Sequence, residues 1–192
     1  MKIYEYLNYD DYVQAQTEAN EVKLKLVWVQ EPTIKLIYNT VGNLKNIKKI
    51  LCHGTRNGAE QKLFRKYFPK AEVLGTEISK TATLFPDTIQ WDFQKQKTDW
   101  VEYWDLIYSN ALDHTTDLVK TLRTWKQQLH RYGVLFIEYS FHNRTTRSDP
   151  LEITKEEFKL ALIQAELICV AIHNTYGMKK IPTKLYEIIL AS

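Results

Sequence analysis

The central part of the chain alternates between short apolar runs and stretches with helical spacing. The residues at 50–52 are all apolar, and this run ends at His53 and Gly54. Between 59 and 68 the apolar residues recur every three or four positions, as on one face of a helix. A second strand is expected at 72–76, around Val73 and Leu74. This order predicts a strand, a turn, a helix and a second strand parallel to the first.

Further apolar runs predict five more strands, at 89–92, 105–109, 134–139, 167–172 and 184–190. Only about ten residues separate the last two strands, which is too few for a helical crossover, so they should pair as an antiparallel hairpin. Helical spacing indicates crossovers between the other strands. The sequence therefore predicts an α/β fold whose mostly parallel, seven-stranded sheet ends in an antiparallel hairpin.

Two helices are expected before the first strand of this sheet. Asp10 or Asp11 can cap the first helix. Pro32 suits the first turn of the second helix, and Gly42 is expected to stop it. Residues 1–45 are therefore predicted to form a helical cap on a single domain.

Two later helices carry signals for their first residues. Asn57 is followed three positions later by Glu60, and Thr154 is followed in the same way by Glu157. Both pairs are typical of a capping box, in which the first side chain accepts from the backbone and the second reaches back. Helices are expected to begin at both places.

Polar residues stand where successive strands end. Gly54 and Gly58 follow the first strand, Glu77 ends the second, and Asp92 ends the third. The carboxyl ends of parallel strands meet at one edge of the sheet, where α/β proteins bind nucleotide-like ligands. Glu77 lies about 20 residues after the turn, where a carboxylate can accept hydrogen bonds from a ribose.

At these residues the sequence resembles the class I S-adenosylmethionine (SAM) dependent methyltransferases. Their turn has an acidic residue and then three glycines at alternate positions, and here these places hold Cys52, Gly54, Arg56 and Gly58. The missing acid leaves one hydrogen-bond acceptor for the methionine end of SAM unassigned. Arg56 stands where the backbone normally runs close to the ligand. The resemblance implies a Rossmann-like three-layer sandwich with a SAM-binding core at 46–192.

The resemblance also implies which residues contact SAM as the cofactor. The acid of the third motif accepts from the adenine amino group, and neighbouring side chains contact the ring. The serine and asparagine that leave the fourth strand resemble the motif that flanks the reacting methyl group. The implied cofactor-binding residues are His53, Gly54, Thr55, Arg56, Gly58, Glu77, Ile78, Asp92, Phe93, Ser109 and Asn110.

The segment after the fourth strand holds the candidate catalytic residues. It has neither the Asn-Pro-Pro-Tyr motif of enzymes that methylate amino groups of nucleic-acid bases nor a Pro-Cys pair of the cytosine-C5 kind. Asp113 and His114 stand where an acceptor hydroxyl could lose its proton, and histidine is best matched to that step near neutral pH. His114 is therefore the predicted base, with Asp113 or His142 as the second choice. Helix capping and surface exposure are the alternative explanations for His114.

The loop that follows the fifth strand is polar, and such loops carry substrate contacts in α/β enzymes. A metal is possible, because Glu138, His142, Asp113 and His114 could converge, but they lack the close ligand spacing of a zinc site and no metal ligand is assigned. Candidates for an acceptor site are Glu138, His142, Arg144, Arg147 and Asp149.

These features predict O-methylation of a hydroxyl on a small acceptor, with a sugar preferred because the loop is polar and aromatic residues are abundant. A nicotinamide-dependent oxidoreductase is the alternative enzyme class, although the turn lacks the Gly-x-Gly-x-x-Gly spacing. A non-catalytic binding module that keeps the fold is the third possibility, since Cys52 and Arg56 depart from the motif.

Composition adds expectations about partners and compartment. The chain has 192 residues, 44% of them apolar, and a net charge of +3 from scattered basic residues, so no nucleic-acid partner is expected. No apolar run approaches the roughly 20 residues of a membrane span, and no signal peptide is evident. Cys52 and Cys169 lie in apolar runs, as buried thiols do. A cytoplasmic protein is expected, and the sequence does not indicate an oligomeric state.

Overall fold

The computed structural model describes residues 1–42, 46–141 and 144–191. A seven-stranded sheet forms its centre, with the strand order β4-β3-β2-β5-β6-β9-β8. Only β9 runs against its neighbours β6 and β8, so the predicted parallel sheet with a terminal hairpin is confirmed. The strands are β2 Lys49–His53, β3 Glu72–Glu77, β4 Thr88–Gln90, β5 Trp104–Ser109, β6 Leu129–Tyr139, β8 Leu167–Tyr176 and β9 Pro182–Leu190.

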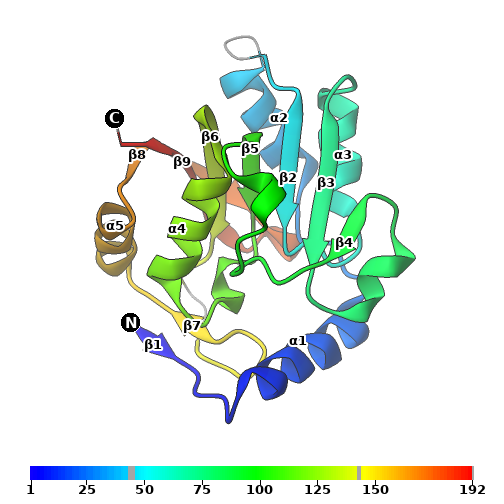
Figure 1. Ribbon diagram of the computed structural model, residues 1–192, viewed down its shortest axis with the longest axis vertical. Helices are drawn as coiled ribbons and strands as arrows, with labels where there is room; N and C mark the ends of the chain where they lie inside the picture. The colour runs from blue at the N-terminus through cyan, green and yellow to red at the C-terminus, as the bar shows by residue number, and fades with distance from the viewer. Residues whose placement is uncertain (43–45, 142–143, 192) are drawn as a thin grey trace.

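Helices cover both faces of this sheet, which makes the predicted three-layer sandwich (Figure 1). The helices α2 (Glu31–Val41) and α3 (Ala59–Tyr67) pack on one face, and α4 (Leu118–Gln128) and α5 (Lys155–Gln164) pack on the other. Successive strand residues alternate between the two cores, because side chains point to opposite faces along a strand. Ile50 and Cys52 of β2 therefore face α2 and α3, and Leu51 faces α4.

The two N-terminal helices take different places in the fold. Helix α2 begins at Glu31, has Pro32 in its first turn and ends before Gly42, as predicted, and it packs into the sandwich through Ile34, Ile37 and Val41. Helix α1 (Tyr9–Lys23) instead lies across the edge of the sheet where β2 and β3 end (Figure 1). Within 1–45, α1 is thus the helix that covers the edge of the sheet.

Three predicted element boundaries were wrong. Asn8, rather than Asp10 or Asp11, caps α1, because its Oδ1 accepts from the backbone of Asp11 at 2.9 Å. Helix α3 has Gly58 as its cap residue with no capping side chain, so Asn57 and Glu60 form no capping box. The strand β6 starts at Leu129, five residues before the predicted range of 134–139. The capping box of Thr154 and Glu157 is confirmed.

A second, two-stranded sheet lies outside the main one. In it β1 (Lys2–Ile3) pairs antiparallel with β7 (Leu151–Glu152), which the sequence pattern did not predict.

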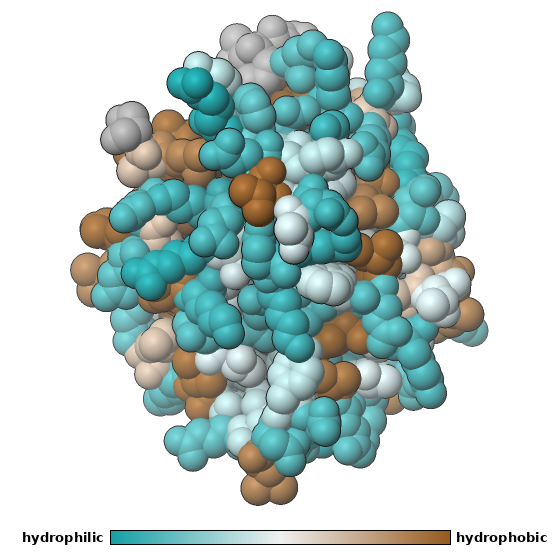
Figure 2. Space-filling view, in the orientation of Figure 1, coloured by the Kyte–Doolittle hydropathy of each residue, from teal (hydrophilic) through white to brown (hydrophobic). Residues whose placement is uncertain are grey.

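Polar residues predominate on the face seen in Figure 2, and the hydrophobic residues there stand in separate patches. Among the helices of the described ranges, none has both the length and the apolar character needed to cross a membrane.

Candidate cofactor and acceptor site

The turn between β2 and α3 keeps a glycine-type backbone at three alternate positions. Gly54 and Gly58 have φ of 73° and 74°, and Arg56 has φ of 46° although it is not glycine. A side chain at Gly54 would meet the Cβ of Ala111 at 2.4 Å, so only glycine fits there. Arg56 therefore replaces the residue type of the motif without changing its left-handed conformation.

His53 at the start of this turn is a core residue. Its Nε2 lies 2.9 Å from Gln128 Oε1, which can only accept, so Nε2 carries the proton and Nδ1 accepts from the Thr76 hydroxyl at 3.0 Å. The ring stacks on Trp125, and burial lowers the pKa of His53 to about 3. Its side chain is neutral and lines neither of the two cavities described below. Of the two residues at this strand end, Gly54 alone lines them.

A large cavity lies where β2, β5 and β6 end and has a volume of about 530 Å³. Ligand pockets span roughly 300 to 1,000 Å³, so this one can hold a small molecule. Its lining includes most of the predicted turn, catalytic and loop residues: Gly54, Thr55, Arg56, Asn110, Asp113, His114, Glu138, Arg144 and Asp149. Trp28 and Lys23, from the N-terminal segment, close one side.

A smaller cavity adjoins it at the ends of β3 and β4. Its volume is about 40 Å³, and it is lined by the predicted nucleoside residues Glu77, Ile78, Asp92 and Phe93. Residues of α1 line the other side, so this helix occupies much of the edge that a nucleoside would need. Gly54 and four other residues line both cavities: Lys23, Arg56, Ala111 and His114.

Polar contacts hold α1 against this edge. The Tyr9 hydroxyl donates to Asp92 Oδ2 at 3.0 Å, and the Gln94 backbone donates to Asp92 Oδ1 at 2.9 Å, so both carboxylate oxygens of Asp92 have partners. The Tyr12 hydroxyl donates to the backbone carbonyl of His114 at 3.1 Å. Glu77 accepts through Oε1 from the Ser79 backbone at 2.9 Å.

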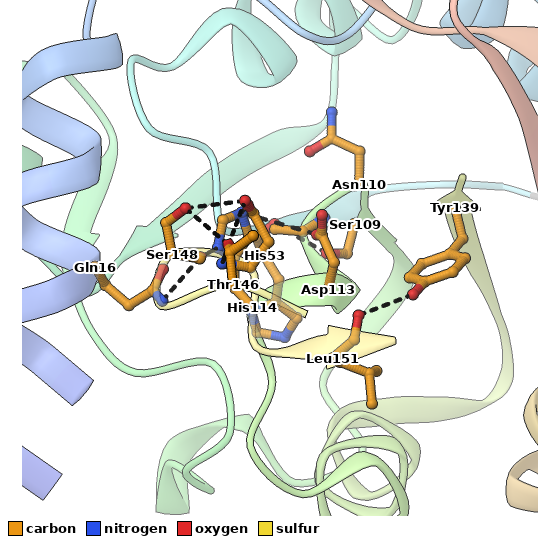
Figure 3. Close-up of polar contacts among 12 residues, drawn as sticks. Gln16, His53, Ser109, Asn110, Asp113, His114, Tyr139, Thr146, Ser148 and Leu151 are labelled. Atoms are coloured by element: carbon orange, nitrogen blue, oxygen red, sulfur yellow. Dashed lines mark hydrogen bonds and ion pairs between the residues drawn. The ribbon is translucent and has the colours of Figure 1, made fainter. Parts of the chain in front are cut away.

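His114 lies at the wall shared by the cavities, near the carboxylates of Asp113 and Asp149. Figure 3 shows His114 together with Asp113 and Ser148. Its Nδ1 lies 2.8 Å from the Ser148 carbonyl, which can only accept, so Nδ1 carries the proton of the neutral ring. Its Nε2 then holds a lone pair, 3.8 Å from Asp113 Oδ1 and 3.9 Å from Asp149 Oδ1. This geometry leaves Nε2 able to accept a proton beside two groups that stabilise the resulting charge.

The two carboxylates differ in their surroundings. Burial raises the pKa of Asp113, although His114 opposes the rise. Burial also acts to raise the pKa of Asp149, but His114, Lys23 and neighbouring hydroxyls together lower it. One ligand atom from each of Asp113, His114 and Asp149 lies within 4.8 Å of the others, so these residues could also hold a cation. The sequence did not predict that Asp149 joins this group.

Besides His53 and Gly58, two predicted site residues line neither cavity, and a third falls outside the described residues. Arg147 donates to Asp11 at 2.9 Å and to Glu18 at 2.7 Å, so it ties the loop to α1 and does not line the cavity. Ser109 is buried and donates to the His53 carbonyl at 3.2 Å. His142, the alternative base, lies outside the residues that the structure describes.

Two buried glutamates line the large cavity. Glu138 accepts from the Tyr108 hydroxyl at 2.8 Å and from the Thr183 hydroxyl at 2.6 Å, and burial raises its pKa. Glu60 accepts through Oε1 from the Asn110 amide at 3.2 Å. Burial raises the pKa of Glu60 to about 7. Its spacing from Asn57 predicted a helix cap, and nothing in the sequence predicted its place in the cavity.

No protein-family model matches the chain, and no curated protein matches it in sequence. Solved structures match its fold. One is the 1,6-didemethyltoxoflavin-N1-methyltransferase of Burkholderia thailandensis, determined with S-adenosylhomocysteine (SAH): it is 12% identical, with a TM-score of 0.69, and the match covers 100% of this chain and 94% of that one.

Two further structures are O-methyltransferases. The one from a trans-AT polyketide synthase of Brevibacillus brevis, in complex with SAH, is 13% identical with a TM-score of 0.69, over 99% of this chain and 82% of that one. The mitomycin 7-O-methyltransferase is 14% identical with a TM-score of 0.65, over 96% of this chain and 61% of that longer one. The chain therefore has the Rossmann-like fold of class I methyltransferases, as the resemblance at the glycine turn predicted.

Proposed function

We propose that the protein is a SAM-dependent methyltransferase that methylates a hydroxyl oxygen on a small acceptor. One observation carries this proposal: the edge that holds Glu77 and Asp92 and the 530 Å³ cavity meet at Gly54 and His114, which line both. A nucleoside at that edge and an acceptor in the cavity would therefore adjoin at a histidine. Similar structures that contain SAH, two of them described above, support the choice of cofactor.

The residues at the edge fit the nucleoside end of SAM. Glu77 keeps one carboxylate oxygen for ribose hydroxyls, since only Oε1 is used by Ser79. Phe93 and Ile78 line the same cavity and can contact an adenine ring. When bound, SAM supplies a methyl group activated by its sulfonium. The chain's own residues must hold the acceptor, exclude water and accept the proton.

His114 is proposed as the group that accepts the acceptor's proton. Its neutral ring presents the Nε2 lone pair, because Nδ1 is engaged by the Ser148 carbonyl. Asp113 and Asp149 then stabilise the imidazolium by charge. Asp113 is the second choice for this role. His142 stays the alternative that the sequence suggested.

A sugar is the proposed acceptor class. Hydroxyl groups need several hydrogen-bond donors and acceptors, and the cavity wall offers Arg144, Ser140 and Thr146. Trp28 in the same wall gives an apolar surface of the kind on which a pyranose ring can lie. The mitomycin and toxoflavin enzymes are named for other small molecules, so the fold neighbours support a small acceptor and leave the sugar as a proposal of its own.

Isothermal titration calorimetry with SAM, SAH and NAD tests the cofactor directly. Glu77→Ala is expected to weaken SAM binding by about 1.5 to 3 kcal/mol, because charge-assisted hydrogen bonds to the ribose are lost. Glu72→Ala, at the exposed opposite end of the same strand, is the matched control and should leave the affinity unchanged. Binding of NAD in place of SAM, or equal SAM affinity in both variants, would reject the assignment.

The Tyr9 hydroxyl is expected to compete with the cofactor. It occupies Asp92 Oδ2, which is the acceptor that an adenine amino group would need. Tyr9→Phe should therefore raise SAM affinity by about two- to tenfold, because moving α1 away from Asp92 would cost less free energy once this hydrogen bond is gone. Tyr176→Phe, at an exposed position, serves as the control for loss of a hydroxyl. Weaker or unchanged SAM binding in Tyr9→Phe, measured by calorimetry, would contradict this competition.

A further inference from the structure

Glu60 has a buried carboxylate with only one of its two oxygens engaged by another side chain. It lies in the first turn of α3, is 5% exposed and lines the large cavity. Its Oε1 accepts from Asn110, but its buried Oε2 has no hydrogen-bond partner within the described residues. A buried charge without a partner is costly, and it is kept where a ligand completes it. The unpaired oxygen therefore indicates a missing donor.

The surroundings of Glu60 indicate that this donor is a cation. Burial raises the pKa of Glu60 and Glu138 adds to the rise, whereas the Glu60 backbone N–H, the Asn110 amide and Arg56 lower it only in part. Tyr108 and Cys52, which also face Glu60, are uncharged because burial raises the pKa of both well above its usual value. This part of the cavity thus favours positive charge in a ligand.

Asn110 supplies a second acceptor beside Glu60. Its Nδ2 donates to Glu60, and none of the hydrogen bonds within 1–42, 46–141 and 144–191 uses its Oδ1. In Figure 3 the Asn110 amide points away from the group formed by His114 and Ser148. A primary ammonium has three N–H donors, so it can satisfy both a carboxylate oxygen and an amide oxygen. A guanidinium or a metal ion would also be attracted, but neither belongs to the proposed cofactor.

We propose that Glu60 and Asn110 form an ammonium subsite that binds the α-ammonium group at the amino-acid end of SAM. The inference rests on the proposed function, and it names the acceptor that the glycine turn leaves unassigned. Cys52 stands where the motif has an acid, and its side chain is fully buried in the core. The Glu60 carboxylate lies close enough to act on the Cys52 thiol by charge. Helix α3 would thus supply the carboxylate that β2 lacks.

Two ligands that differ only at the amino-acid end test this subsite. SAH carries the α-ammonium, whereas 5′-methylthioadenosine has the same thioether nucleoside without the amino-acid group. Calorimetry on the full chain should show SAH binding weakened about 10- to 100-fold in Glu60→Gln, because a charge-assisted bond is lost. The affinity for 5′-methylthioadenosine should stay within about twofold, since this ligand does not reach Glu60. Glu77→Ala is the matched contrast and should weaken both ligands.

Each outcome decides the proposal. A parent protein that binds neither ligand would remove the proposed function and the subsite with it. A parent that binds both, with Glu60→Gln affecting both equally or neither, would keep the function and overturn the subsite. Asn110→Ala is the second variant, and it should also weaken SAH while sparing 5′-methylthioadenosine. Thermal unfolding of each variant without ligand separates lost binding from lost folding.

Discussion

Replacing His114 with alanine is expected to lower turnover by about 10² to 10⁴-fold while SAM affinity stays nearly unchanged. A hydroxyl near neutral pH holds its proton tightly, so the attacking oxygen needs a base in position. Only Nε2 of His114 has a free lone pair, because Nδ1 donates to the Ser148 carbonyl. Single-turnover rates with a hydroxylated acceptor and calorimetry with SAM measure the two quantities separately.

His130→Ala is the control for this experiment, since His130 lies at the start of β6, outside both cavities. Asp149→Asn should lower turnover less than His114→Ala, because the asparagine keeps the shape of the site but removes one charge beside the imidazolium. A variant lacking His114 that turns over at close to the parent rate would remove the proposed base. His142→Ala should act mainly through the acceptor KM.

A chelator distinguishes the base from a cation site. The same three residues, Asp113, His114 and Asp149, could hold a divalent ion, and loss of His114 would then also slow the reaction. If His114 acts as a base, a chelator should leave turnover unchanged. Loss of activity with the chelator, restored by added Mg²⁺ or Mn²⁺, would assign the cluster to a metal.

The sheet and its polar edge could be predicted because local patterns determine them. Short strand-like segments, separated by stretches with helical spacing, predict parallel crossovers, and the short link before β9 predicts the hairpin. Gly54, Glu77 and Asp92 then meet at one edge because parallel strands share their direction. Each of these inferences uses neighbours in sequence and a general rule of sheet geometry.

The residues through which α1 contacts the edge of the sheet could not be predicted, because its buried face includes Gln16 and Asn20. The buried residues Tyr12, Gln16 and Asn20 follow helical spacing, but they contact the edge of the sheet and not an apolar core. Hydrophobic periodicity does not register such a face. Its contact with Asp92 and the small volume of the nucleoside cavity are consequences that appear only in three dimensions.

The position of the Glu60 side chain is a second feature that the sequence pattern could not predict. Its spacing from Asn57 is that of a capping box, and it lies in the first helical turn, where acids are favoured. The left-handed Gly58 instead starts the helix, so the Glu60 side chain is released from the cap and turns into the cavity beside Asn110. Whether Glu60 caps the helix or lines the cavity depends on the backbone conformation of Gly58.

Glu60→Gln is expected to stabilise the protein at pH 8 by about 3 kcal/mol and to have almost no effect near pH 4. Burial raises the pKa of Glu60 from 4.5 to about 7 in the folded protein. Between these values the folded state binds more protons than the unfolded state, so the free energy of unfolding falls as pH rises. Glutamine stays neutral at every pH and keeps the shape of the side chain, so the variant does not lose this stability as the pH rises.

Urea unfolding of the ligand-free parent and variant at pH 4, 6 and 8 measures the difference. Glu72→Gln, on an exposed carboxylate, is the control and should show no such trend. A variant that is less stable than the parent at pH 8 would show that Glu60 serves the fold, as an acid at a helix N-terminus can. A gain that grows with pH, together with weaker SAH binding, would show a residue that costs stability and contributes to ligand binding.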